Sequence, residues 1–274
     1  DEAINRGDKK KLLEFNINEK PVALQLGGSS PKLLAEATKV GEDFGYDEIN
    51  LNLGCPSKKV EKNRFGACLM KEPNLVADCL SKMQSVTKLP VTIKTRIGYD
   101  DVEDYENLHS FISTLKATGV KTFIIHARKA MLGKFTPKQN LNIPKLNYKM
   151  VYDIKKENPN LEIIINGGIT KIEEIDNHLK HCDGVMIGRS IYQNPYSLIE
   201  IEKEIDSTKN VTSSSDNEIN DLNEDPLGGV RRTIDEEQFQ EYLEKNYIID
   251  ILTIRETPNT TDPNVVYYQY EVRL

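Results

Sequence analysis

Residues 122–126 read Thr-Phe-Ile-Ile-His, a short run of β-branched and aromatic residues that predicts a β-strand. The run is apolar nearly throughout and does not alternate with polar residues. Such a run is typical of a strand that is covered on both faces, as the strands of parallel α/β sheets are. The run therefore predicts the inside of a parallel sheet flanked by helices.

Five similar runs lie outward from this one along the chain, three before it and two after it. They are Val22–Leu26, Glu48–Leu53, Val91–Thr95, Glu162–Ile165 and Gly184–Ile187. Amphipathic helical patterns fill the intervals: Ser30-Pro31 and Pro73 predict helix starts, whereas Gly119 and Asn158-Pro159 predict helix ends. Strand–helix alternation over this length predicts an α/β fold with a parallel sheet, either doubly wound or closed as a (β/α)8 TIM-type barrel.

Six strands fall two short of a (β/α)8 barrel, and nothing after Tyr196 supplies two more in the same rhythm. We therefore expect the deficit before residue 1, so that the six runs are strands three to eight of an incomplete barrel over residues 1–206. Asp1 is not an initiator residue, which agrees with a true N-terminus that lies upstream.

The composition changes beyond the predicted barrel. Residues 207–233 are rich in Ser, Asn, Asp and Glu and predict a disordered acidic linker. Residues 234–274 predict a small α+β tail of uncertain fold, with a helix over Asp235–Asn246 and strands over Tyr247–Ile254 and Val265–Val272. The pattern assigns this tail no function.

Charge and cysteine content narrow the function classes. The net charge of the whole chain is -7. Residues 201–274 hold 7 Lys and Arg against 17 Asp and Glu, whereas residues 1–200 hold 29 Lys and Arg against 26 Asp and Glu. The predicted barrel is therefore mildly basic, which permits an RNA partner. Cys55, Cys68, Cys79 and Cys182 lack CxxC spacing, which argues against a zinc site or a disulfide framework and favours a reducing compartment. No apolar run approaches the roughly 18 residues of a membrane helix.

Polar residues and glycines stand at the C-terminal ends of the predicted strands, where parallel barrels form their active sites. They are Gln25, Asn52, Cys55, Lys94, Arg96, His126, Arg128, Asn166, Gly167, Gly168, Gly188 and Arg189. Each alone has an ordinary explanation, such as a buried core histidine, a small buried cysteine or a tight turn. Their joint placement at one end of six strands predicts an active site.

The loops after the last two predicted strands indicate a phosphate site. Barrels commonly bind phosphate in the loops after strands seven and eight, which are Gly167-Gly168 and Gly188-Arg189 on this numbering. Glycines let backbone N–H groups approach a phosphate closely, and Arg189 places a cation beside them.

Six motifs in a fixed order carry a family resemblance. They are Ile49–Ser57, Arg64–Met70, Val91–Gly98, His126–Ala130, Asn166–Ile169 and Met186–Arg189, the last followed by Asn194-Pro195-Tyr196. Together they resemble the signature of tRNA-dihydrouridine synthases over roughly residues 2–200. Gln25–Ser29 and Gly66–Met70 are similar to the bacterial A-type branch of that family.

The resemblance implies an FMN- and NADPH-dependent oxidoreductase that reduces a uridine of tRNA to 5,6-dihydrouridine, with Cys55 as the general acid that protonates the uracil. The residues implied to hold the ring and ribityl chain of FMN are Gln25, Lys94 and His126. Those implied to hold its phosphate are Asn166, Gly167, Gly168, Gly188 and Arg189. Those implied to contact the substrate are Asn52, Arg96 and Arg128.

Three features depart from the family pattern. The first two strands have no counterpart, relatives usually carry Arg where this chain has Leu141, and their helical tRNA-gripping C-terminal domain is not recognisable in the acidic tail. One alternative interpretation is therefore a truncated, non-catalytic relative. Another is an FMN barrel that acts on a free pyrimidine, as dihydroorotate dehydrogenase does. We expect a cytoplasmic monomer with tRNA as partner and neither metal nor membrane, and organellar targeting stays open.

Overall fold

The six apolar runs form the six parallel strands of one sheet in the computed structural model, which describes residues 1–198, residue 201 and residues 252–255. The strands are β1 Ala23–Leu26, β2 Glu48–Asn52, β3 Val91–Arg96, β4 Thr122–His126, β5 Glu162–Asn166 and β6 Gly184–Ile187. Each strand pairs in parallel with the next along the chain. All six predicted strands are confirmed, with ends that differ by at most one residue.

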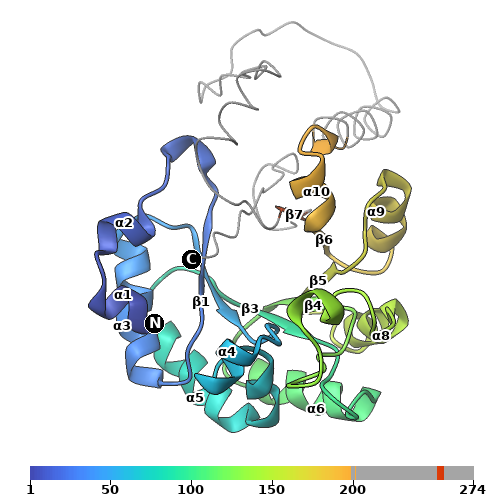
Figure 1. Cartoon of the computed structure of the whole chain (residues 1–274), viewed down its shortest axis with the longest axis horizontal. Coiled ribbons are helices and arrows are strands. Elements are labelled where there is room, and N and C mark those ends of the chain that lie inside the picture. The colour runs from blue at the N-terminus through green and yellow to red at the C-terminus, as the bar shows by residue number, and fades with distance from the viewer. Residues whose placement is uncertain (199–200, 202–251, 256–274) are drawn as a thin grey trace, which may run out of the picture.

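The connecting helices lie on the outer side of the curved sheet, as Figure 1 shows. The larger ones are α3 Pro31–Asp43, α5 Pro73–Gln84, α6 Tyr105–Lys116, α8 Tyr148–Glu157 and α9 Ile172–Leu179. Shorter elements are α1 Glu2–Arg6, α2 Lys9–Leu13, η1 Ile17–Glu19, α4 Lys58–Lys62, η2 Gly66–Lys71, α7 Pro137–Asn140 and α10 Arg189–Gln193. Six parallel strands with outer helices form a half-barrel, which confirms the predicted α/β class.

The helices begin where the sequence signals place them. Ser30 caps α3 by accepting a hydrogen bond from the backbone N–H of Leu33, and Pro31 occupies the first turn. Asn158 caps the C-terminal end of α8, one residue before the proline that prevents continuation. These local signals explain why the segments between the strands fold as helices.

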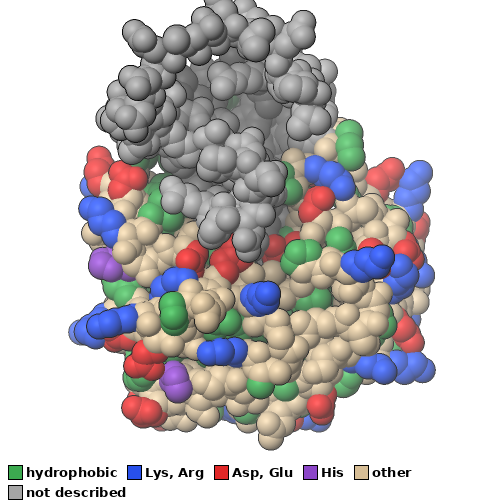
Figure 2. Space-filling view, turned by 180° about the vertical axis from the view of Figure 1, so that it is seen from behind, with side chains coloured by type: hydrophobic (Ala, Val, Ile, Leu, Met, Phe, Trp, Pro, Cys, Tyr) green, Lys and Arg blue, Asp and Glu red, His purple; other side chains and the backbone are tan. Residues whose placement is uncertain are grey.

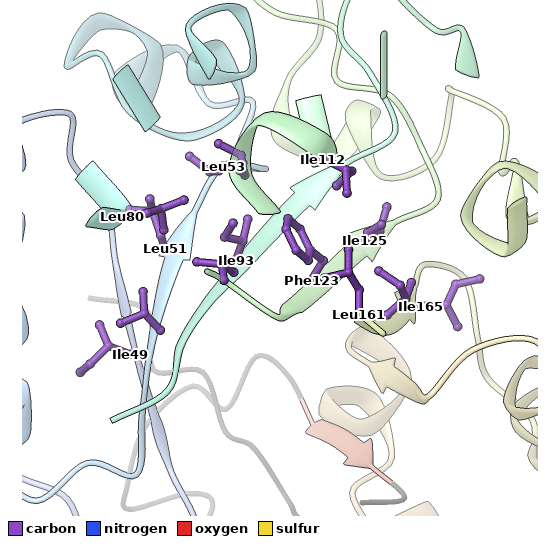
Figure 3. Close-up of a cluster of buried hydrophobic side chains, with 14 of the residues drawn as sticks. Ile49, Leu51, Leu53, Leu80, Ile93, Ile112, Phe123, Ile125, Leu161 and Ile165 are labelled. Atoms are coloured by element: carbon purple, nitrogen blue, oxygen red, sulfur yellow. The ribbon is translucent and has the colours of Figure 1, made fainter. Parts of the chain in front are cut away.

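The main core lies between the sheet and its outer helices. Figure 3 shows Leu51, Ile93, Phe123, Ile125 and Ile165 gathered from four strands. Their alternate neighbours face the inside of the arc, where Ile124, Ile164 and Met186 form a separate apolar cluster. The inner face is polar on the first three strands, where Asn50 and Thr92 are buried, so the curved sheet has apolar residues on both faces only in its second half.

A seventh strand, β7 Leu252–Arg255, pairs antiparallel with β6. It overlaps the end of the strand predicted over Tyr247–Ile254, but its partner was not foreseen. Among the described strands β1 pairs only with β2, so this sheet is an open arc in the order β1 to β7. The predicted linker over residues 207–233, the helix over Asp235–Asn246 and the strand over Val265–Val272 lie outside the described residues and stay predictions.

The described surface has no single charge character on the face in Figure 2, where Lys and Arg side chains are interspersed with Asp and Glu. No helix within residues 1–198 has the length and apolar character needed to cross a bilayer. The same part of the chain brings together no cluster of His, Cys, Asp or Glu suited to a metal ion.

Candidate active site

A cavity of about 350 Å³ lies at the carboxyl ends of the parallel strands. Eleven of the twelve residues predicted from the strand ends line it: Gln25, Asn52, Cys55, Lys94, Arg96, His126, Asn166, Gly167, Gly168, Gly188 and Arg189. Curvature of the sheet brings strand ends that are more than 160 residues apart in the sequence to one wall. The predicted joint placement of these residues is therefore confirmed, whereas their roles stay predictions.

Hydrogen bonds to the backbone of Cys55 hold this residue in the loop after β2. Asn52 Oδ1 accepts hydrogen bonds from the backbone N–H groups of Gly54 at 3.1 Å and Cys55 at 3.0 Å. The carbonyl of Cys55 accepts from the backbone N–H of Ala67 at 2.9 Å. The loop thus places the half-buried Cys55 side chain at the cavity wall rather than in the core.

Cys68, in the same motif region, has a different environment. Its thiol donates a hydrogen bond to the carbonyl of Phe65 at 3.1 Å, and it does not line the cavity. Burial raises the pKa of the Cys68 thiol above its ordinary value. The two cysteines are therefore separated by position, and only Cys55 can meet a molecule in the cavity.

Arg96 lines the cavity but uses its guanidinium group on the backbone of the site. Its Nε donates to the carbonyl of Gly54 at 2.7 Å, and its Nη1 donates to the carbonyls of Lys129 at 3.1 Å and Asn140 at 3.3 Å. The side chain is buried, with 3% exposure. These bonds connect the Cys55 loop to the segments that follow β4.

The cavity is electropositive. Burial lowers the pKa of His126 well below its ordinary value, and the charges of Arg96, Lys94, Arg128 and Arg189 lower it further. His126 is therefore neutral at pH 7 and can present both a donor and an acceptor. No Asp or Glu is found among the described residues that line the cavity. The positive charges of Lys94, Arg96 and Arg189 in the lining favour an anionic ligand.

The loop after β5 leaves no room for side chains. Gly167 has φ +120°, and a Cβ there would lie 2.5 Å from Cδ2 of His126. Gly168 has φ +73°, and its Cβ would lie 2.8 Å from Leu146. The hydroxyl of Tyr148 fixes the same loop by donating to the carbonyl of Gly167 at 2.6 Å. Backbone thus stands where side chains would otherwise exclude a ligand.

The loop after β6 places Arg189 at the cavity. Its Nη1 donates to Asn142 Oδ1 at 2.9 Å, and its Nη2 donates to the carbonyl of Leu141 at 3.4 Å. Leu141 lines the cavity itself. Lys94 approaches Asn166 from β3, with Nζ 3.5 Å from Asn166 Oδ1. Two cationic side chains thus face the two glycine-containing loops.

Arg128 is the one predicted residue that does not line the cavity. The backbone turns directly after β4, where the N–H of Arg128 donates to the carbonyl of His126 at 2.7 Å. Its Nη1 donates to the carbonyl of Pro144, in the segment that follows α7. Its expected contact with the substrate stays a prediction.

Several polar residues of the site were missed from the sequence. Thr170, Ser190 and Gln193 line the cavity beside the glycine loops. Asn140 is fully buried and accepts from the backbone N–H of Met131 at 2.6 Å, which shapes the loop after β4. The polar residue at every second position of β2 is the sequence signal for a polar inner face.

Substitution of Gly167 by alanine is expected to destabilise the protein by about 2–5 kcal/mol, from a left-handed backbone cost of about 1–2 and a clash of about 1–3. Gly45, with φ +88° and no atom within 4 Å of a Cβ, is the matched control. Gly45→Ala carries the backbone cost alone, so it is expected to lose about 1–2 kcal/mol. Urea unfolding of both variants measures the difference, and equal losses would contradict the packing against His126.

A family model and the curated relatives agree on one family. The family described as "Dihydrouridine synthase (Dus)" matches residues 1–236. The chain is 51% identical over 213 residues to the tRNA-dihydrouridine(20/20a) synthase of Synechocystis sp., covering 78% of this chain and 64% of that protein. It is 53% identical over 209 residues to the synthase of the same name from Shewanella oneidensis, covering 76% of this chain and 62% of that protein. The chain spans about three-fifths of the length of these curated relatives.

Proposed function

This chain belongs to the bacterial A-type branch of the dihydrouridine synthase family, and we propose that its cavity binds FMN and serves the NADPH-dependent reduction of a tRNA uridine to 5,6-dihydrouridine. The observation that carries the proposal is the single cavity in which eleven predicted residues from six strand ends meet. The names of the relatives specify uridines 20 and 20a, and we propose the same positions for this chain.

The residues of the cavity fit a flavin mononucleotide. A volume of about 350 Å³ lies within the range of small-molecule sites, roughly 300–1,000 Å³. The backbone at Gly167 and Gly168 and the guanidinium of Arg189 suit a phosphate, because N–H groups and a cation stabilise its charge. Amide side chains of Gln25 and Asn52 suit the polar edge of a heteroaromatic ring, and Ile169 and Met186 supply apolar wall.

The chemistry divides between the cofactor and the chain. When bound, FMN accepts a hydride from NADPH and supplies it to C6 of the uracil. Cys55 Sγ would hold the proton that C5 receives, which completes addition of two hydrogens to the double bond. His126 is neutral, so it can orient a polar ligand by hydrogen bonding.

The target base must leave the stack to reach a cavity at the strand ends. Leu141 and Pro137 lie at the cavity wall, so a flipped base would meet apolar surface there. Arg189 holds the carbonyl of Leu141, and Arg128 holds that of Pro144. The segment after α7 is thus braced at two points beside the proposed base pocket.

Incubation of the whole protein with FMN, NADPH and unmodified tRNA tests this function. Nucleoside mass spectrometry should show a uridine at position 20 or 20a that has gained two hydrogen atoms. Free uridine and dihydroorotate are the control substrates, because their turnover would favour the free-pyrimidine alternative. If FMN binds but none of these substrates is converted, the result would favour the non-catalytic alternative.

A further inference from the structure

A continuous row of hydrogen bonds runs along the inner face of β1, β2 and β3, from a buried carboxyl group to the loop that holds Cys55. Its members are Glu48, Thr92, Asn50, Gln25 and Asn52. The hydroxyl of Thr92 donates to Glu48 Oε1. Asn50 Nδ2 donates to Thr92 Oγ1 at 2.8 Å, Gln25 Nε2 to Asn50 Oδ1 at 2.8 Å, and Asn52 Nδ2 to Gln25 Oε1 at 2.7 Å.

The direction of every bond in this row follows from its ends. The backbone N–H groups of Gly54 and Cys55 can only donate, so Asn52 must turn its oxygen toward them. Its nitrogen then faces Gln25, which must accept, and the same reasoning passes to Asn50 and Thr92. The row ends on a carboxyl oxygen of Glu48, which accepts from Thr92. This direction agrees with the polarity that the backbone N–H groups set at the other end of the row.

This polarity determines what two residues offer to the cavity. Gln25 and Asn52 both line it. Asn52 Oδ1 accepts two backbone bonds and Gln25 Oε1 accepts one bond from Asn52, so both oxygens are directed toward partners within the protein. One N–H bond of each amide nitrogen is also used within the row, which leaves the second N–H of each. This part of the wall therefore presents donors, and it recognises carbonyl oxygens or ring nitrogens of a ligand.

We infer that Glu48 and Thr92 are positioning residues that fix the amide orientation of Gln25 and Asn52 from outside the cavity. The inference rests on the proposed function, in which the ligand is a flavin with carbonyl oxygens at its ring edge. Glu48 is 7% exposed, Asn50 2% and Thr92 1%, so none of the three exchanges its partner for bulk water. Without the Thr92 acceptor, nothing at this end of the row holds the amide nitrogen of Asn50, so the orientations of Asn50 and Gln25 are no longer fixed from this end.

The chain contains a matched control on the same face of the sheet. Thr122 Oγ1 donates to Glu162 Oε2 at 2.5 Å, one strand away from the Thr92–Glu48 pair. Both threonines are buried, at 8% and 1% exposure, and both bond a glutamate near the start of a strand. Among the bonds that the structure describes, only the Thr92 pair continues to the cavity.

Thr92→Val, Thr92→Ser and Thr122→Val in the whole protein test the inference, with FMN as the probe. Thr92→Val is expected to raise the Kd for FMN about tenfold, roughly the equivalent of one lost hydrogen bond, and to shift the visible absorption band of the bound flavin. Thr92→Ser restores the hydroxyl and should match the unmodified protein in both readouts. Thr122→Val should leave the Kd and the band unchanged, even where it lowers Tm as much as Thr92→Val does.

Equal effects of Thr92→Val and Thr122→Val on FMN would overturn the inference, because they would report general destabilisation. Unchanged FMN binding in Thr92→Val would overturn it alone, while leaving the proposed function intact. Failure of the unmodified protein to bind FMN would overturn both. Glu48→Gln preserves volume and gives a second test if Thr92→Val does not fold, since an amide nitrogen at that end can donate to Thr92. The Kd of Glu48→Gln for FMN is expected to rise as well, and an unchanged Kd would contradict the inference.

Discussion

Cys55→Ala is expected to lower the rate of uridine reduction by about 10²–10⁴-fold, the contribution typical of a positioned general acid. FMN affinity should be unchanged, since the Cys55 loop is held through backbone atoms that alanine retains. Reduction of the flavin by NADPH should also proceed at the normal rate, because it needs no proton from the uracil side. Single-turnover assays that follow flavin absorbance and dihydrouridine separately measure the three quantities.

Cys68→Ala is the matched control for this prediction. Its thiol bonds the carbonyl of Phe65 and is kept from the cavity, so its loss is expected to change the rate less than about threefold. A full rate in Cys55→Ala, or a larger loss in Cys68→Ala, would show that the proton reaches the uracil from another group.

Arg189→Ala is expected to raise the Kd for FMN about 10- to 150-fold, because a phosphate loses a charge-assisted bond worth roughly 1.5–3 kcal/mol. The same substitution removes the bonds from Arg189 to Asn142 and Leu141. Asn142→Ala separates the two effects, since it removes a loop contact and keeps the cation. Fluorescence titration with FMN should show near-normal affinity for Asn142→Ala.

Arg64→Ala is a second control, because its guanidinium is engaged with the carboxylate of Glu72 at 3.1 Å and lies outside the cavity lining. Its Kd for FMN should equal that of the unmodified protein. If Arg189→Ala bound FMN as well as Arg64→Ala does, the phosphate would lie elsewhere than at the loop after β6.

The strands were predictable because the side facing the helices is apolar on every strand and the inner side is apolar as well on the later strands, and every predicted run became a strand. The site was predictable for a related reason. Parallel strands direct their carboxyl ends to one edge, so residues as distant as Gln25 and Arg189 had to lie at the same edge if the runs were strands of one sheet, and the curvature of the sheet brings them to one cavity. Neither argument depended on knowing which strands were neighbours.

The features that the sequence did not predict depend on which residues bond to each other rather than on which residues are buried. Arg128 follows His126 by two residues, yet its guanidinium bonds the carbonyl of Pro144 and Arg128 does not line the cavity. Strand β7 could be recognised as extended, but a local pattern does not indicate that Leu252–Arg255 pairs antiparallel with β6. The buried row from Glu48 to Asn52 was missed for the same reason, because its meaning lies in bonds between strands.

A crystal structure of the whole protein with FMN bound tests the central claim most directly. The account predicts the phosphate between Gly168, Gly188 and the guanidinium of Arg189. It also predicts the ring edge against the amide nitrogens of Gln25 and Asn52, with Cys55 Sγ facing the open side of the ring. A phosphate bound away from both glycine-containing loops, or a ring that meets neither amide, would contradict it.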